Sequence, residues 1–161
     1  MEWEQKIPGM AYIAIPYLGE KGQDCPMEDR ELSFHVANKI AAYFLSQGEV
    51  VYSPITHSHP IHFYMNGMGN DHDLWMKYDE VMSSYCNRIY IICKGNWKKS
   101  KGVMREMGWF KRDKKPIFLI AVLEDWKISI AYPVGNTEHS TFPHSVEDRR
   151  AIVEFTEAKR A

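Results

Sequence analysis

The sequence lacks the features that would direct a chain into or across a membrane. The first ten residues contain no apolar run of signal-peptide length, and no stretch is long and apolar enough to span a bilayer. There are only three cysteines, an odd number with no CxxC spacing: Cys25, Cys86 and Cys93. We therefore expect free thiols, a cytoplasmic location and no contact with a membrane.

An excess of charge of either sign is also missing. The formal net charge is −1 over 161 residues, so no overall positive field favours binding to a nucleic-acid polymer. Neither a Walker phosphate loop nor a GxGxxG motif after the first apolar run occurs. Aromatic residues, in contrast, are abundant at 13%. They fit either an aromatic-rich core or a pocket that stacks a planar ligand.

Short apolar runs alternate with amphipathic stretches along the chain. Runs typical of buried strands occur at 10–16, 49–54, 88–93, 116–123 and 126–133. Helical periodicity occurs at 27–48, at 71–86, in the second half of 94–110 and at 145–160. The remaining long segment, 55–70, is expected to be a loop, and loops of this length are often functional.

This alternation predicts an α/β fold. We expect a single doubly wound three-layer sandwich with a parallel, flavodoxin-like or Rossmann-like sheet of about five strands. One domain would cover 1–161, with a core at about 10–122 and a C-terminal strand and helix at 126–158. Ligands bind such sheets beyond the carboxyl ends of the strands, so 16–30, the segment after Ser53 and the turn at 94–102 are the expected site walls.

Two carboxylates lie on apolar helix stripes near this edge. Glu106 aligns with Val103 and Phe110, and Asp79 aligns with Trp75 and other apolar residues, at i±3 and i±4 spacing. A buried acid is costly unless it is paired or reaches a cavity. Slightly rotated helices that leave both acids in solvent remain the alternative. Paired carboxylates suit glycosidic chemistry, in which one attacks the anomeric carbon and the other manages the leaving group's proton.

Several of these segments resemble the nucleoside 2-deoxyribosyltransferase superfamily, in particular an uncharacterised phage and bacterial branch. The run "YIAIPY", Arg30 at the start of a long helix and "GEVVYSP" are similar to its N-terminal half. The stretch from Asp79 through "SKGVMREMG" is similar to its catalytic half. The resemblance covers roughly residues 10–122.

The resemblance implies roles for particular residues. Glu106, in the pattern Gly102-x-x-x-Glu106-x-Gly108, would be the nucleophile, and Asp79 would assist it. Ser100 stands where the transferases often carry an aspartate that touches the base. A serine there is similar to the 2'-deoxynucleoside 5'-monophosphate N-glycosidases, where it contacts phosphate. The expected substrate-binding residues are Tyr12, Pro16, Tyr17, Arg30, His57, Trp75, Trp97, Ser100 and Gly102.

The expected activity is therefore cleavage of the N-glycosidic bond of a (deoxy)nucleoside 5'-monophosphate, with release of the free base. Exchange of bases by a transferase is the alternative within the same superfamily. No cofactor and no metal are expected, and the partner is a small-molecule nucleotide or nucleoside. The superfamily commonly completes its pocket from a neighbouring subunit, which implies a homo-oligomer.

Two further interpretations stay open. The first is a metal-dependent hydrolase, because "HSHPIH" brings His57, His59 and His62 together in sequence, although the spacing matches no H-E-x-x-H site. The second is a nucleotide sensor without catalysis, because a fold of this class does not by itself specify an enzyme. Glu106 distinguishes an N-glycosidase from a sensor, since the enzyme needs the Glu106 carboxylate for turnover and a sensor does not.

Overall fold

A computed structural model describes residues 7–18, 21–68, 71–122 and 128–133. Its centre is a five-stranded sheet with the order β2-β1-β3-β4-β5. The strands are β1 (Met10–Ala14), β2 (Val50–Tyr52), β3 (Arg88–Ile92), β4 (Ile117–Val122) and β5 (Ile128–Pro133). The α/β class and the layered sandwich are confirmed.

The expected parallel sheet of about five strands needs a correction. The strands β2, β1, β3 and β4 are parallel, but β5 pairs with β4 in the antiparallel direction. The reason is the length of the connection. Only five residues separate Val122 from Ile128, and a parallel crossover needs a dozen or more. The helix expected at 145–160 lies outside the described residues.

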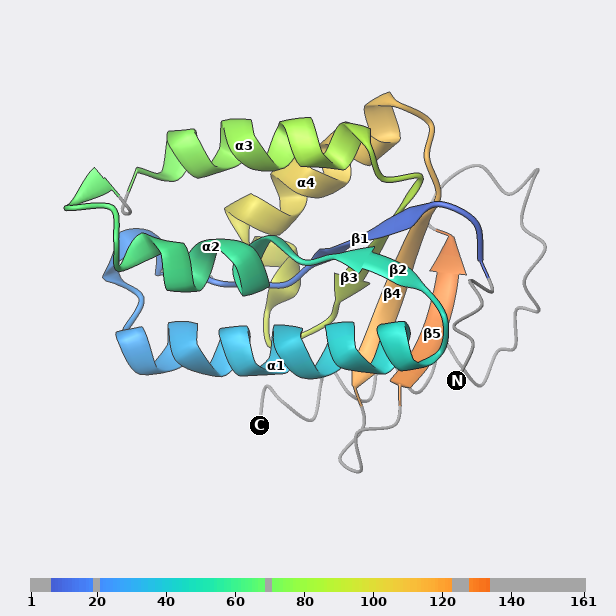
Figure 1. The fold of residues 1–161 in the computed structure, drawn as a ribbon, viewed down its shortest axis with the longest axis horizontal. Helices are drawn as coiled ribbons and strands as arrows, with labels where there is room; N and C mark the ends of the chain where they lie inside the picture. Colours follow the sequence, from blue (N-terminus) through green and yellow to red (C-terminus); the bar gives the residue numbers. More distant parts are fainter. Residues whose placement is uncertain (1–6, 19–20, 69–70, 123–127, 134–161) are drawn as a thin grey trace.

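Helices cover both faces of the sheet. They are α1 (Met27–Ser46), α2 (Pro54–His62), α3 (His72–Ser84) and α4 (Lys101–Arg112), with short 3₁₀ turns at Gly22–Asp24 and Trp97–Lys99. Figure 1 shows α1 on one side of the sheet and α3 with α4 on the other. Alternate side chains of β1 point to opposite faces of the sheet. Ala11 and Ile13 pack towards α1, while Tyr12 and Ala14 pack towards α3 and α4. No helix in the described ranges is long and apolar enough to cross a membrane.

The segment expected to be a loop at 55–70 begins as a helix. Pro54 occupies its first turn, where the missing N–H would have no partner in any helix. Pro60 lies in the last turn, so it removes a hydrogen bond only near the end of the helix. The two prolines and the polar residues between them gave this segment only a weak helical pattern, so the sequence did not predict the helix. The buried side of α2, which includes Ile55 and His59, packs against the sheet and α1.

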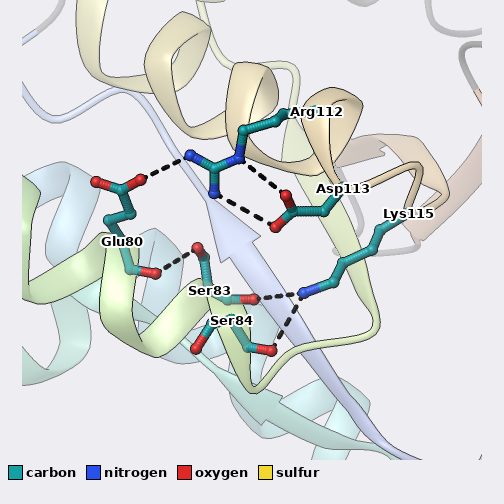
Figure 2. Close-up of polar contacts among 6 residues, drawn as sticks. All are labelled: Glu80, Ser83, Ser84, Arg112, Asp113 and Lys115. Atoms are coloured by element: carbon teal, nitrogen blue, oxygen red, sulfur yellow. Dashed lines mark hydrogen bonds and ion pairs between the residues drawn. The ribbon is translucent and has the colours of Figure 1, made fainter.

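The carboxyl end of α3 is fastened to the segment that follows α4. Lys115 Nζ donates to the carbonyl oxygens of Ser83 and Ser84 at 3.1 and 3.2 Å, where the helix has unsatisfied acceptors (Figure 2). Arg112 reaches from α4 to Glu80 on α3 at 2.8 Å. These contacts hold together the two helices that carry Asp79 and Glu106.

A buried ion pair stabilises the opposite, amino end of the strands. Arg88 opens β3 and lies 3.2 Å from Glu49, which precedes β2. Tyr90 donates its hydroxyl to the same Glu49 oxygen, and Arg88 also donates to the Pro8 carbonyl at 3.1 Å. Glu49 and Arg88 are both more than nine-tenths buried, so removal of either partner would leave the other charge buried without its counter-charge.

Candidate functional site

A cavity of about 490 Å³ lies at the carboxyl ends of the parallel strands. Its walls come from the connection between β1 and α1, from α2, from the first half of α3 and from the start of α4. This is the position where open α/β sheets bind ligands, and the volume is that of a small-molecule site.

Two carboxyl groups reach the cavity wall from different helices. Glu106 on α4 accepts a hydrogen bond from the Tyr12 hydroxyl at 2.8 Å. Asp79 on α3 accepts one from the Tyr52 hydroxyl at 3.3 Å. Glu106 is only 6% exposed and Asp79 only 5%. The expectation that both acids face a cavity, rather than solvent, agrees with this geometry.

The two tyrosines are neighbours because of the strand register. Tyr12 on β1 pairs with Tyr52 on β2, so both side chains leave the sheet on the same face. Their ring centroids are 5.7 Å apart. The sheet therefore presents two phenol donors side by side, and each holds the carboxyl group of a different helix.

Burial makes both acids hard to ionise. It raises the pKa of Asp79 from its usual value to about 7, while the bond from Tyr52 acts in the opposite direction. Burial also raises the pKa of Glu106 well above its usual range, and the neighbouring Asp79 charge adds to that rise. The bond from Tyr12 favours the ionised form of Glu106. Such a pair holds a proton at neutral pH, as acid–base chemistry requires.

Histidines and aromatic rings form another wall. His59 on α2 shares a hydrogen bond of 2.6 Å with the Tyr17 hydroxyl and stacks on Phe34 at 4.5 Å between ring centroids. Burial lowers the pKa of His59, so this ring is neutral at pH 7. The side chains of His62, His72 and Trp75 also line the cavity. This wall offers flat surfaces and polar edges to a planar ligand.

Basic side chains line the remaining part. Lys21 and Arg30 come from the β1–α1 side, and Lys99 and Lys101 flank Ser100 at the start of α4. Ser100 is the N-cap of α4, because its hydroxyl accepts a hydrogen bond from the Val103 amide at 3.4 Å. The Arg30 guanidinium is fixed by a bond from Nε to the Cys25 carbonyl at 3.1 Å. The cavity thus combines buried acids with a cationic wall.

The model of a domain of unknown function (DUF1937) matches residues 9–122. The chain belongs to this family. The match begins next to β1 and ends at the last residue of β4, so every residue that lines the cavity falls within the DUF1937 domain. A comparison with curated proteins gives no match.

The DUF1937 domain brings most of the expected site residues together. Seven of them line the cavity: Tyr17, Arg30, Trp75, Asp79, Ser100, Gly102 and Glu106. Tyr12 is completely buried and reaches the site through its bond to Glu106. Gly102 leaves space for a ligand, because, apart from its chain neighbours and the nearby backbone of α4, no atom lies within 4 Å of the position that a Cβ atom would take.

Three expected residues do not line this cavity. Trp97 packs into the core between the sheet and α4. His57 lies on the outer side of α2, where its ring stacks on Tyr78 at 5.3 Å between centroids. Pro16 is buried, and its carbonyl accepts a hydrogen bond from Ser33 at 2.8 Å. Helical geometry explains why His57 points away from the cavity while His59 lines it, because residues 57 and 59 lie about 200° apart around a helix.

Sequence reasoning missed Tyr52 and the lysines of the DUF1937 domain's cavity. Tyr52 carries a signal, since it ends a strand that a doubly wound sheet places beside β1. Lys21, Lys99 and Lys101 gave no such signal in the sequence, because lysine side chains are ordinarily found on protein surfaces. Among the described residues, no group of three or more His, Cys, Asp or Glu side chains is placed to hold a metal ion.

Proposed function

We propose that the chain cleaves the N-glycosidic bond of a (deoxy)nucleoside 5'-phosphate. The observation that carries the proposal is the pair of buried carboxyl groups, Glu106 and Asp79, facing one cavity and each held by a tyrosine. Buried acids without a counter-charge cost stability, and a catalytic pair is a reason to keep them. The resemblance to nucleoside 2-deoxyribosyltransferases assigns the same two residues.

The carboxyl pair shares one proton, and the reactive form is the one in which that proton lies on Asp79 and Glu106 is ionised. In the first step, Glu106 in this form attacks C1' of the sugar through an oxocarbenium-like transition state. The C1'–N bond breaks and its electron pair stays on the base nitrogen. Asp79, whose pKa of about 7 keeps part of it protonated at neutral pH, gives its proton to the leaving base. The products of this step are the free base and a glycosyl ester of Glu106.

Water resolves the ester in the second step. Asp79, now a carboxylate, takes a proton from the water as its oxygen bonds to C1'. The bond between C1' and Glu106 breaks, which restores the Glu106 carboxylate. The net reaction adds one water to the nucleotide and yields a free base and a sugar phosphate. A second base in place of water would make the reaction a transfer.

The walls of the cavity fit the two ends of this substrate. Trp75 on α3 presents a flat group on which a base can stack. Ser100 and the first turn of α4 offer a polar cradle beside Lys99 and Lys101, where a phosphate is favoured. The carboxyl groups proposed to act on the sugar line the same cavity.

The test is a base-release assay followed by liquid chromatography. The purified protein is incubated with ribo- and deoxynucleosides and their 5'-phosphates, with and without a second free base. We expect free base from the phosphates, at least about 1,000-fold less of it with Glu106→Gln, and unchanged release with Glu28→Gln, an exposed acid in the first turn of α1. A new nucleotide formed only with added base would assign transfer instead. Binding without release by any substrate would overturn the proposal and favour a sensor.

A further inference from the structure

The cavity concentrates positive charge that the whole chain does not have. The full sequence has a net charge of −1, but four basic side chains line this one cavity against two acidic ones. The four basic residues belong to two segments far apart in sequence. Lys21 and Arg30 come from the β1–α1 side, and Lys99 and Lys101 come from the start of α4.

This charge exceeds what a single phosphate balances. A phosphate monoester carries about −1.5 to −2 at pH 7. In the reactive form proposed above, one of the two acids is protonated, so the four cationic side chains outnumber the ionised lining acids by three. A ligand with a further anionic group would match the lining more closely, and charge complementarity of this kind governs which ligand is preferred.

We propose that the preferred substrate is a nucleotide whose 5' end carries a pyrophosphate, with one phosphate beside Ser100 and the next held by Lys21 and Arg30. This inference rests on the proposed N-glycosidase function and specifies its substrate class. Nucleoside diphosphates and dinucleotides joined through a pyrophosphate share the chemistry that these two cationic segments recognise.

The β1–α1 side is built to hold an anion at little cost. Arg30 is nine-tenths buried, with its Nε bonded to the Cys25 carbonyl and its guanidinium 5.9 Å from the centre of the Tyr17 ring. The guanidinium is therefore oriented before a ligand arrives, which reduces the entropy lost on binding. Lys21 pairs with Asp29 at 3.4 Å in an exposed contact that contributes little, so the lysine can turn to a phosphate.

The experiment compares one nucleoside in four forms: free, as the 5'-monophosphate, as the 5'-diphosphate and as a pyrophosphate-linked dinucleotide. Base release is measured as kcat/KM in the presence of EDTA, so that no divalent cation shields the phosphates. We expect the diphosphate to exceed the monophosphate by about tenfold or more, and Lys21→Gln to remove most of that preference. Lys98→Gln is the matched control, because Lys98 lies over the Trp97 ring rather than in the cavity wall.

The dinucleotide separates the two sources of a pyrophosphate. Turnover equal to that of the diphosphate means that the second phosphate may be bridged, and poor turnover means that it must be terminal. Equal or better turnover of the monophosphate would overturn the inference and leave the N-glycosidase function standing. The inference would also be overturned if Lys21→Gln and Lys98→Gln changed the preference for the diphosphate over the monophosphate equally.

Binding supplies a readout that does not depend on catalysis. The affinities of the monophosphate and diphosphate for Glu106→Gln are measured by calorimetry, with and without the Lys21→Gln change. Tighter binding of the diphosphate that depends on Lys21 supports the inference even if no base is released and the proposed function fails. Equal affinities would overturn it.

Discussion

Tyr12 donates its hydroxyl to the Glu106 carboxylate at 2.8 Å across 94 residues of sequence. The phenol comes from a central strand and is completely buried, while the acid comes from one turn inside α4. Because the strand fixes the phenol, the bond fixes the carboxylate as well. In the proposed mechanism, Glu106 held in this way needs little reorganisation before it attacks.

Removing the Tyr12 hydroxyl should make Glu106 harder to ionise. The bond favours the carboxylate, so Tyr12→Phe is expected to raise the pKa of Glu106 further. The acid limb of the kcat/KM profile for base release should then move to higher pH, with activity at pH 7 reduced by about tenfold or more. An unchanged limb in a folded variant would show that the bond has no part in ionisation.

Asp79→Asn should move the acid limb of the kcat/KM profile for base release to lower pH. The Asp79 charge raises the pKa of Glu106, and asparagine removes that charge while keeping the shape of the side chain. We expect the acid limb at lower pH, a reduced kcat because the proton donor is lost, and no alkaline limb near pH 7. The measurement is the pH dependence of base release. Glu28→Gln, which removes an exposed acid of α1 that does not line the cavity, should leave the pH profile of base release unchanged.

Neutralising Glu106 should stabilise the protein above neutral pH. The folded state holds the proton of a carboxyl whose pKa is raised, and the unfolded state releases it once the pH exceeds about 4.5. The free energy of unfolding therefore falls as pH rises from the unfolded pKa towards the folded one. Glu106→Gln should raise Tm by roughly 5 °C at pH 8 and change it little at pH 4. Tm is measured for the parent and for Glu106→Gln at both pH values. An equal rise in Tm at pH 4 and pH 8 would contradict this prediction.

A side chain at position 102 should block the cavity without disturbing the helix. Gly102 lines the cavity with open space around it, and Gly108 on the same helix also has open space but does not line the cavity. Leucine at either position should stabilise α4 by about 0.5–1 kcal/mol, because glycine is a poor helix former. We expect Gly102→Leu to lower substrate affinity at least tenfold and Gly108→Leu to leave it unchanged. Calorimetric titration compares the two.

The ion pair at the amino ends of the strands should affect stability alone. Arg88→Met leaves Glu49 buried without its cation, which should cost about 3–5 kcal/mol in the free energy of unfolding. The double variant with Glu49→Leu should recover part of that loss, because no unpaired charge remains. Denaturant unfolding measures both effects. Values of kcat and KM for the folded variant should equal those of the parent, since the pair lies at the end of the sheet away from the cavity.

Local patterns were sufficient for most elements of the fold. The apolar runs around Tyr12 and Ile91 belong to central strands that are buried on both faces, and such strands need continuous hydrophobic sequence. The spacing of Asp79 and Glu106 on apolar stripes likewise indicated that both acids point inwards, because helical periodicity is a local property. Strand and helix alternation then placed the site at the carboxyl edge of the sheet.

Tertiary structure decided what depends on partners distant in sequence. Helix α2 forms through packing of Ile55 against α1 and the sheet, which outweighs the weak helical signal of a segment with two prolines. The direction of β5 follows from a short connection, and the burial of Trp97 follows from the space between the sheet and α4. The pairing of Tyr12 with Tyr52 was set by strand order. No local sequence pattern indicates which strands become neighbours. Only the tertiary structure therefore shows that the two phenol donors that hold the carboxyl pair lie side by side.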